Sequence, residues 1–357
     1  MGRFSTYFWA AFFIFINMQI GLASDSDSLI QRGIELSINH RYAEAESIFA
    51  QIISENPDQP EGYFFMAATI QSKMMDYESD TWDRDFHHYI ELAIATSEKQ
   101  LAEHPGDNLS LFYQGSALSY LAFYQGRKQE YVAALRNAMA GISRLKRIAG
   151  TDPEFADVYF GLGSYKYWWS RATKYLNWLP LLSDDRRDGI RMVERAVEQG
   201  QFTRYAAMNE LIWMLLDASL SGEAFAWSLR GLEKFPDSRF FLWGAAKSAL
   251  ALDKINDAER YFTRLLNSIT AEPINNGYNE SICRINLAEI NFELKHFEHA
   301  QSQLDRLTGM QLAPGIEKRL VDQRERASQL QKKLSKSASQ SRASVFENKL
   351  TNVQSGK

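Results

Sequence analysis

Three prolines recur at one fixed interval in the first half of the chain. Pro57, Pro105 and Pro153 are each 48 residues apart, and each follows a run of helix-forming residues. Proline just after such a run is a helix stop signal. The stretches that follow, "YFFMAA", "LFYQGS" and "YFGLGS", align without gaps at the same interval. Self-similarity at a fixed period is typical of repeat architectures, so the chain is predicted to be a stack of similar units.

Small residues recur at that interval inside the units. Ala93, Gly141 and Gly189 occupy equivalent positions in the second helix expected for each unit. Two antiparallel helices approach closely only where the side chains at their crossing are small, and larger residues three and four positions away fill the space beside it. With only 8 prolines in 357 residues, this pattern predicts an all-α fold of helical hairpins that share one continuous core.

The first unit, residues 27–57, resembles the tetratricopeptide repeat (TPR) nearly position for position. The matching residues are Gly33, Leu36, Tyr42, Ala45, Phe49, Ile52 and Pro57, with later copies at Ala246, Ala258, Phe262 and Leu265 and at Ala288, Ala300, Leu304 and Leu307. The resemblance implies a right-handed α-solenoid of about seven TPR-like helix pairs over residues 24–310. The second, third and fourth pairs are extended to the 48-residue period.

The N-terminus has the outline of a secretory signal peptide at residues 1–23. Arg3 precedes an uncharged run from Phe4 to Ser24, and Gly21 and Ala23 are the small residues of a cleavage site. We expect cleavage after Ala23, with a retained membrane anchor as the alternative. The single cysteine, Cys283, can form no intrachain disulfide. An exported protein of this kind fits the bacterial periplasm, or a secreted location.

Two further segments are expected at the C-terminus. Residues 311–334 read as a charged helix that caps the stack. Residues 335–357 are rich in serine and poor in large apolar groups, which predicts a disordered tail.

The sequence carries no strong motif for chemistry. "FGLGSYK" lacks the third glycine of a dinucleotide fingerprint and the Gly-Lys-Ser/Thr of a P-loop. His87 and Glu91 are four residues apart, but the sequence supplies no third metal ligand beside them. The net charge of −4 creates no general attraction for nucleic acid. We therefore expect a protein that is not an enzyme, has no cofactor or metal, and does not bind nucleic acid.

The TPR resemblance also implies a concave face that binds partners, lined by fixed positions of the first helix in each pair. Carried onto this chain, those positions are Phe64, Phe112, Phe160, Asn209 and Trp243 at the fifth position, Trp213 and Lys247 at the ninth, and Gln71, Ser119 and Tyr167 at the twelfth. Aromatic rings with a few polar groups suit an extended or helical peptide. The expected function is a non-catalytic scaffold that binds protein or peptide partners in the bacterial cell envelope.

Other interpretations of the aromatic residues stay open. The second to fourth units could form an aromatic pocket for a small molecule or a lipid. Their longer helices could also curl the superhelix until these rings pack together as core. The aromatic segment Tyr165–Trp178 could make a peripheral membrane contact.

Overall fold

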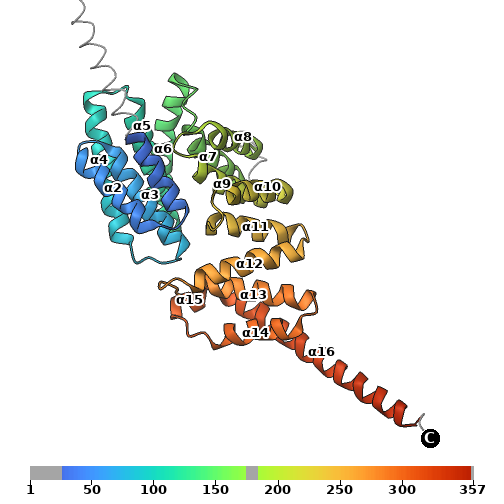
Figure 1. The fold of residues 1–357 in the computed structure, drawn as a ribbon. Helices are drawn as coiled ribbons and strands as arrows, with labels where there is room; N and C mark the ends of the chain where they lie inside the picture. The colour runs from blue at the N-terminus through green and yellow to red at the C-terminus, as the bar shows by residue number, and fades with distance from the viewer. Residues whose placement is uncertain (1–25, 174–183, 355–357) are drawn as a thin grey trace, which may run out of the picture. The chain divides into compact units, whose positions relative to one another are not determined.

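Helices make up all the regular structure of the part of the chain that is described, residues 26–173 and 184–354 of a computed structural model (Figure 1). The all-α prediction is confirmed. The expected signal peptide lies outside the described residues, as does Trp178 at the end of the aromatic segment. In the helices that are described, none has an apolar run long enough to cross a bilayer.

Two compact units divide these helices. The first unit includes the chain up to Asp76, then Asp80–Leu220 and Arg230–Ser238. Its helices are residues 26–38, α2 (Tyr42–Glu55), α3 (Pro60–Asp76), α4 (Asp83–Glu103), α5 (Asn108–Arg127), α6 (Tyr131–Thr151), α7 (Val158–Thr173), α8 (Arg186–Gln199), α9 (Arg204–Asp217) and the end of α10 (Ser221–Lys234). The second unit includes Tyr77–Ser79, Ser221–Leu229 and the chain from Arg239 onward. Its helices are the start of α10, α11 (Arg239–Ala251), α12 (Ile255–Thr270), α13 (Tyr278–Glu293), α14 (Phe297–Gly309), α15 (Pro314–Arg319) and α16 (Val321–Gln354).

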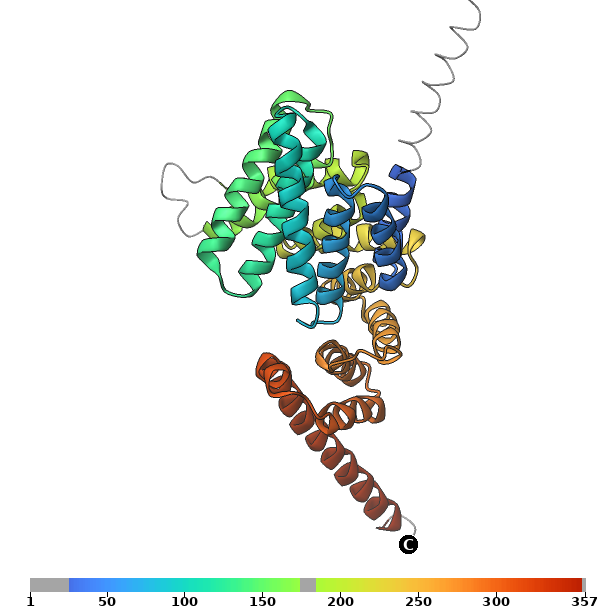
Figure 2. The same cartoon turned by 90° about the vertical axis from the view of Figure 1, so that its left-hand side faces the viewer.

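Consecutive helices of the first unit pack as hairpins that stand side by side (Figure 2). Glycines lie at two of the crossings. A Cβ atom on Gly141 of α6 would lie 2.6 Å from the carbonyl oxygen of Gly115 in α5. A Cβ atom on Gly163 of α7 would lie 2.6 Å from the carbonyl oxygen of Gly189 in α8. The backbones therefore touch at the small residues, which is the packing that the sequence predicted.

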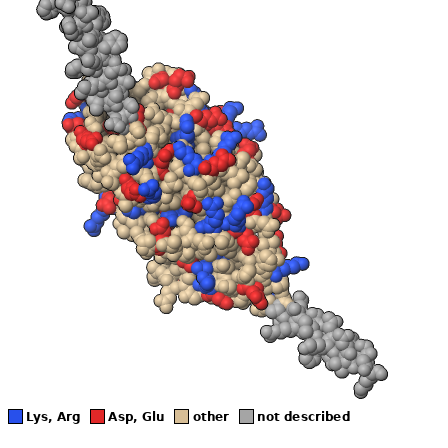
Figure 3. Space-filling view, viewed as in Figure 1, with Lys and Arg blue, Asp and Glu red and all other residues tan. Residues whose placement is uncertain are grey.

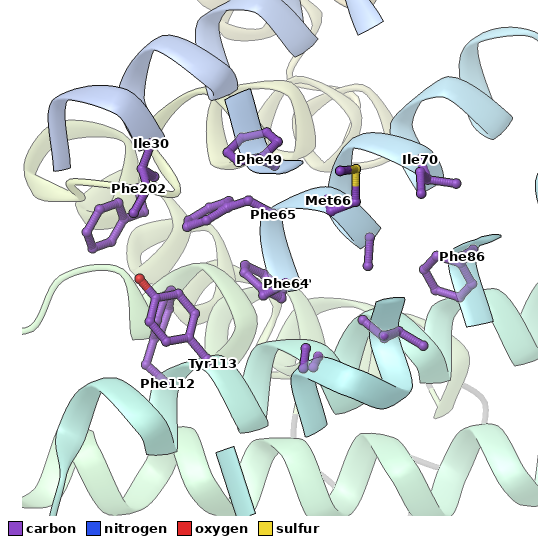
Figure 4. Close-up of a cluster of buried hydrophobic side chains, with 14 of the residues drawn as sticks. Ile30, Phe49, Phe64, Phe65, Met66, Ile70, Phe86, Phe112, Tyr113 and Phe202 are labelled. Carbon is purple, nitrogen blue, oxygen red and sulfur yellow. The ribbon is translucent and has the colours of Figure 1, made fainter. Parts of the chain in front are cut away.

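Aromatic rings fill the middle of the first unit (Figure 4). Phe64 packs against Phe65, Phe112, Tyr113 and Tyr120, with ring centroids 5.1 to 6.4 Å apart. These rings come from α3 and α5, two first helices of neighbouring hairpins. The middle of this unit is thus a packed hydrophobic core.

The first described helix, residues 26–38, contacts segments of the first unit that come much later in the chain. Gln31 donates a hydrogen bond to the carbonyl oxygen of Gln201, and the hydroxyl of Ser238 donates to the carbonyl oxygen of Ile38 at 2.9 Å. Lys234 also forms an ion pair with Glu35. Because the start of the unit meets its end, the stack of hairpins closes on itself.

In the second unit, the C-terminal helix packs against the last hairpin. Leu330 and Leu334 of α16 are buried with Leu304 and Leu307 of α14. Arg326 of α16 also forms an ion pair with Glu289 of α13. This helix therefore covers the last hairpin, as a capping helix would.

The end of the chain contains two helices. A short helix, α15, precedes the capping helix, and α16 continues to Gln354, far past residue 334. The disorder expected for residues 335–357 stays a prediction. The length of α16 is compatible with its sequence, since residues 321–354 contain no glycine or proline and many residues with high helix propensity, such as Lys, Gln, Arg and Ala.

Candidate partner-binding face

The ten residues expected on the concave face fall into two groups. Four are buried: Phe64, Gln71, Phe112 and Tyr167 are between 0% and 7% exposed. The other six keep some exposure: Phe160, Ser119, Asn209, Trp213, Trp243 and Lys247. For the buried group, the structure favours the interpretation that the rings are core.

In each pair, the twelfth position of the first helix lies four residues, or about one helical turn, after the small residue at the crossing. The side chain at the twelfth position therefore points toward the second helix of the pair. A Cβ atom on Gly189 would lie 2.9 Å from the Cβ of Tyr167. One on Gly141 would lie 2.7 Å from the hydroxyl of Ser119. Tyr167 is held there by a hydrogen bond of 2.9 Å to the carbonyl oxygen of Met214 and another of 2.8 Å to Asp217.

Two tryptophans of the first unit remain partly exposed near Glu210, one through a hydrogen bond and the other through its place on the same helix. The indole N–H of Trp168 in α7 donates a hydrogen bond to Glu210 of α9. Trp213 lies three residues after Glu210, on the same side of α9. Trp168 and Trp213 are 39% and 37% exposed, which is high for such large apolar side chains. We call Trp168, Asn209, Glu210 and Trp213 the tryptophan face.

Burial controls the electrostatics of this face. Loss of contact with water raises the pKa of Glu210, and the hydrogen bond from Trp168 opposes that change. Burial also raises the pKa of Tyr120 to about 12, and the negative charge of Glu210 contributes to that rise. Asn209 adds an unused acceptor, because its buried side-chain oxygen has no hydrogen-bond partner in the described structure.

Sequence reasoning named Asn209 and Trp213 as candidates but not Trp168 and Glu210. Trp168 lies one residue past the twelfth position, so it is rotated by about 100° away from the helix crossing. A signal for it existed, because Tyr120 is an aromatic residue one 48-residue period earlier. No comparable signal marked Glu210.

The two expected residues of the second unit are packed against aromatic and charged neighbours. The rings of Trp243 and Phe262 meet edge to face with centroids 6.1 Å apart, and the ammonium of Lys247 lies 5.5 Å from the centroid of Phe262. Burial lowers the pKa of Lys247, and the positive charge of Arg326 lowers it further. Lys247 therefore lies beside the capping helix rather than in open solvent.

The aromatic segment with a possible membrane contact is only partly described. Trp169 stacks on Tyr165 with ring centroids 5.9 Å apart, and Trp169 is 41% exposed. Residues 174–178 lie outside the described residues, so membrane contact through Tyr165–Trp178 stays a prediction. Over the described ranges, the chain shows no group of three or more potential metal ligands.

Solved structures with low sequence identity have a similar fold. The Cut9–Hcn1 hetero-tetramer of the APC/C aligns with a TM-score of 0.50 and 14% identity, over 80% of this chain and 46% of that chain. PilW, a type IV pilus biogenesis factor, aligns with a TM-score of 0.45 and 15% identity, over 69% of this chain and 97% of that one. TTC0263, a TPR protein of Thermus thermophilus, aligns with a TM-score of 0.39 and 17% identity, over 64% and 98%.

No protein-family model matches the sequence, and no curated protein matches it either. At these identities the structural likeness concerns the fold alone. The fold is TPR-like, built from helical hairpins whose small residues meet at the crossings.

Proposed function

We propose that the protein is a non-catalytic scaffold that binds a protein or peptide partner through the tryptophan face. The observation that carries this proposal is a pair of partly exposed rings: Trp168 donates a hydrogen bond to Glu210, and Trp213 lies three residues after Glu210 on α9. Tryptophan is enriched among the residues that dominate binding energy in protein interfaces, because a large rigid ring gives contact area at little cost in entropy.

The position of the two rings supports a surface role. Trp168 is fixed by its hydrogen bond to Glu210, so a partner would meet a ring that is already oriented. The carboxylate of Glu210 is a hydrogen-bond acceptor, which suits a partner that presents N–H donors. The aromatic pocket for a small molecule has less support, because the rings it would need contact one another in the core.

The location belongs to the same proposal. The signal-peptide pattern of residues 1–23 and the single buried cysteine support export to the bacterial cell envelope. Fractionation of cells that carry a C-terminally tagged chain tests this location. A tagged protein found only in the cytosol would contradict it. The expectation that nucleic acid is not a partner stays a prediction.

Proteins that bind the tagged chain are captured from a cell extract and identified by mass spectrometry. Calorimetry with the purified partner then measures the affinity. Trp213→Ala should weaken binding by roughly 30-fold, the effect of losing about 2 kcal/mol at an interface hot spot. Trp169→Ala is the matched control, because Trp169 is equally exposed on α7 but stacks on Tyr165 instead of contacting Glu210. Equal losses in both variants, or no loss in either, would refute the tryptophan face as the binding surface.

A further inference from the structure

Helix α6 differs in charge from the rest of this acidic chain. Its sequence contains four basic residues and no aspartate or glutamate, although the whole chain has a net charge of −4. The four are Arg136, Arg144, Lys146 and Arg147. Elsewhere, on the face drawn in Figure 3, basic and acidic side chains are interspersed. The positive charge of α6 is therefore a local feature.

These four cations are not neutralised within the described structure. Arg144 donates to the side-chain oxygen of Gln114 at 2.9 Å and to the carbonyl oxygen of Ala140 at 3.2 Å. Arg147 donates to the carbonyl oxygen of Pro105 at 2.8 Å. Arg136 and Lys146 are exposed. Since amide and carbonyl oxygens carry no net charge, the helix keeps its positive field.

Large apolar side chains share the outer surface of α6. Tyr131, Val132, Leu135 and Met139 are 68%, 86%, 44% and 59% exposed. At 100° per residue, Val132, Leu135, Arg136 and Lys146 all project within about 60° of Met139. The buried residues of the helix, such as Gly141 and Leu145, lie on the opposite side, against α5 and α7. We call the residues Tyr131, Val132, Leu135, Arg136, Met139 and Lys146 the outer surface of α6.

The preceding hairpin shows that the fold does not require this composition. In α4, the positions 48 residues before Val132, Leu135 and Met139 hold Arg84, His87 and Glu91. Arg84 and Glu91 are exposed, like their counterparts in α6. The same outer site thus carries charge in one hairpin and large apolar groups in the next. Four exposed apolar side chains gathered on such a site favour contact with something beyond the chain.

A cavity beside α6 adds an anion-binding element. It has a volume of about 390 Å³ and lies between α4, α5 and α6. Ser143, Arg144, Arg147 and Gln114 line it with hydrogen-bond donors, and Glu98 of α4 lines the same cavity. Two guanidinium groups in one cavity suit the phosphate of a lipid headgroup.

We propose that the outer surface of α6 binds the surface of an anionic lipid bilayer. Tyr131, Val132, Leu135 and Met139 would enter the boundary between headgroups and acyl chains, and Arg136 and Lys146 would face the anionic headgroups. Helices that lie in a membrane interface combine an apolar face with Lys and Arg in this way. A second copy of this chain is a poorer occupant, because two α6 helices in contact would bring eight positive charges together. This inference does not depend on the proposed function.

A local fluorescent probe tests the proposal in the full chain. Met139→Cys, labelled with a polarity-sensitive dye, reports on the outer surface of α6, since the native Cys283 is fully buried. Glu91→Cys places the same dye at the equivalent site of α4 as the matched control. The vesicles are phosphatidylcholine alone, or equal parts of phosphatidylcholine and phosphatidylglycerol. The N-terminal segment is common to all samples, so vesicle attachment through that segment alone would leave the dye at residue 139 in water.

The dye at residue 139 should shift to the blue with the anionic vesicles only, and the dye at residue 91 should not shift. High salt should reverse the shift, because it screens the attraction to the headgroups. Arg136→Gln combined with Lys146→Gln should raise the lipid concentration for a half-maximal shift by roughly 25-fold. These two side chains are exposed, so the variant should fold normally.

Three outcomes would overturn the proposal. The dye at residue 139 could stay in water with anionic vesicles, or both dyes could shift to the same extent. A shift that depends on protein concentration without any vesicles would instead identify a second copy as the occupant.

Discussion

Gly163 of α7 and Gly189 of α8 face each other so closely that a Cβ atom on Gly163 would lie 2.6 Å from the carbonyl oxygen of Gly189. The same atom would lie 2.8 Å from the side chain of Val193. A methyl group fits this crossing only if the two helices separate. The hairpin therefore depends on the absence of a side chain at this position.

Gly163→Ala should destabilise the first unit by about 1 to 3 kcal/mol, the usual cost of overpacking a tight interior. Chemical denaturation followed by circular dichroism measures the loss. Gly150→Ala is the control, because Gly150 lies in α6 with no heavy atom within 4 Å of the added Cβ. That change should be neutral or stabilising by up to about 1 kcal/mol, since alanine favours a helix over glycine. Equal destabilisation of the two variants would contradict the crossing geometry.

Phe112→Ala should lower the stability of the first unit by about 3 to 5 kcal/mol, because it opens a cavity among packed rings. The ring of Phe112 is 1% exposed and lies 5.3 Å from Phe155 and 6.4 Å from Phe202, measured between centroids. Trp213→Ala, on the tryptophan face, should change stability by much less. Thermal unfolding of both variants checks this, and a small effect of Phe112→Ala would return that residue to a binding role.

Asp157→Ala should cost about 3 kcal/mol or more, because several buried or half-buried donors would lose one shared acceptor. The carboxylate accepts hydrogen bonds from the backbone N–H groups of Gln201, Phe202 and Thr203 at 2.7 to 3.0 Å, and from the hydroxyl of Thr203. It thereby ties the start of α7 to the start of α9.

Asp107→Ala is the comparison for Asp157, because Asp107 caps α5 through a single bond to the N–H of Ser110. The loss of that one cap should cost about 1 kcal/mol. Urea unfolding of the two variants gives the difference in the free energy of unfolding. An equal loss in the free energy of unfolding for the two variants would show that the hydrogen bonds of Asp157 stabilise the chain no more than a single helix cap does.

Glu210→Gln should make stability less sensitive to pH. Burial raises the pKa of Glu210 in the folded chain, whereas the unfolded value is about 4.3. Between these two values the folded chain binds more protons than the unfolded chain, so stability falls as pH rises through that window. Glutamine cannot ionise, and it keeps an oxygen for the indole of Trp168. The thermal midpoint of the variant should therefore exceed that of the native chain at neutral pH, and the gap should close below about pH 4. A difference in thermal midpoint that widens as the pH falls would contradict the raised pKa of Glu210.

Cys283 should react with a thiol reagent only when the second unit opens. Its side chain is fully buried in α13, and burial raises the pKa of the thiol well above its ordinary value, which leaves very little thiolate. Labelling with a chromogenic disulfide reagent should be very slow in buffer and fast in denaturant. Rapid labelling of the native protein would show that this helix is exposed.

Periodic features of the sequence predicted the helices and their crossings. The helix ends followed from proline spacing and local propensity, and the crossings followed from glycine and alanine at equivalent positions, since only small residues allow close approach. At the end of the chain, serine content predicts disorder, whereas the absence of glycine and proline is compatible with the continuation of α16 to Gln354.

Only the tertiary structure decided which aromatic residues are available to a partner. The direction of a side chain depends on the rotation of its helix, and one residue of offset separates the buried Tyr167 from the exposed Trp168. The burial of Phe112 depends on Phe202, which the helix at residues 26–38 helps to enclose through Ile30 and Gln31. The contact between the helix at residues 26–38 and the later segments of the first unit results from small rotations between successive hairpins. A local pattern in the sequence does not predict the total of these rotations.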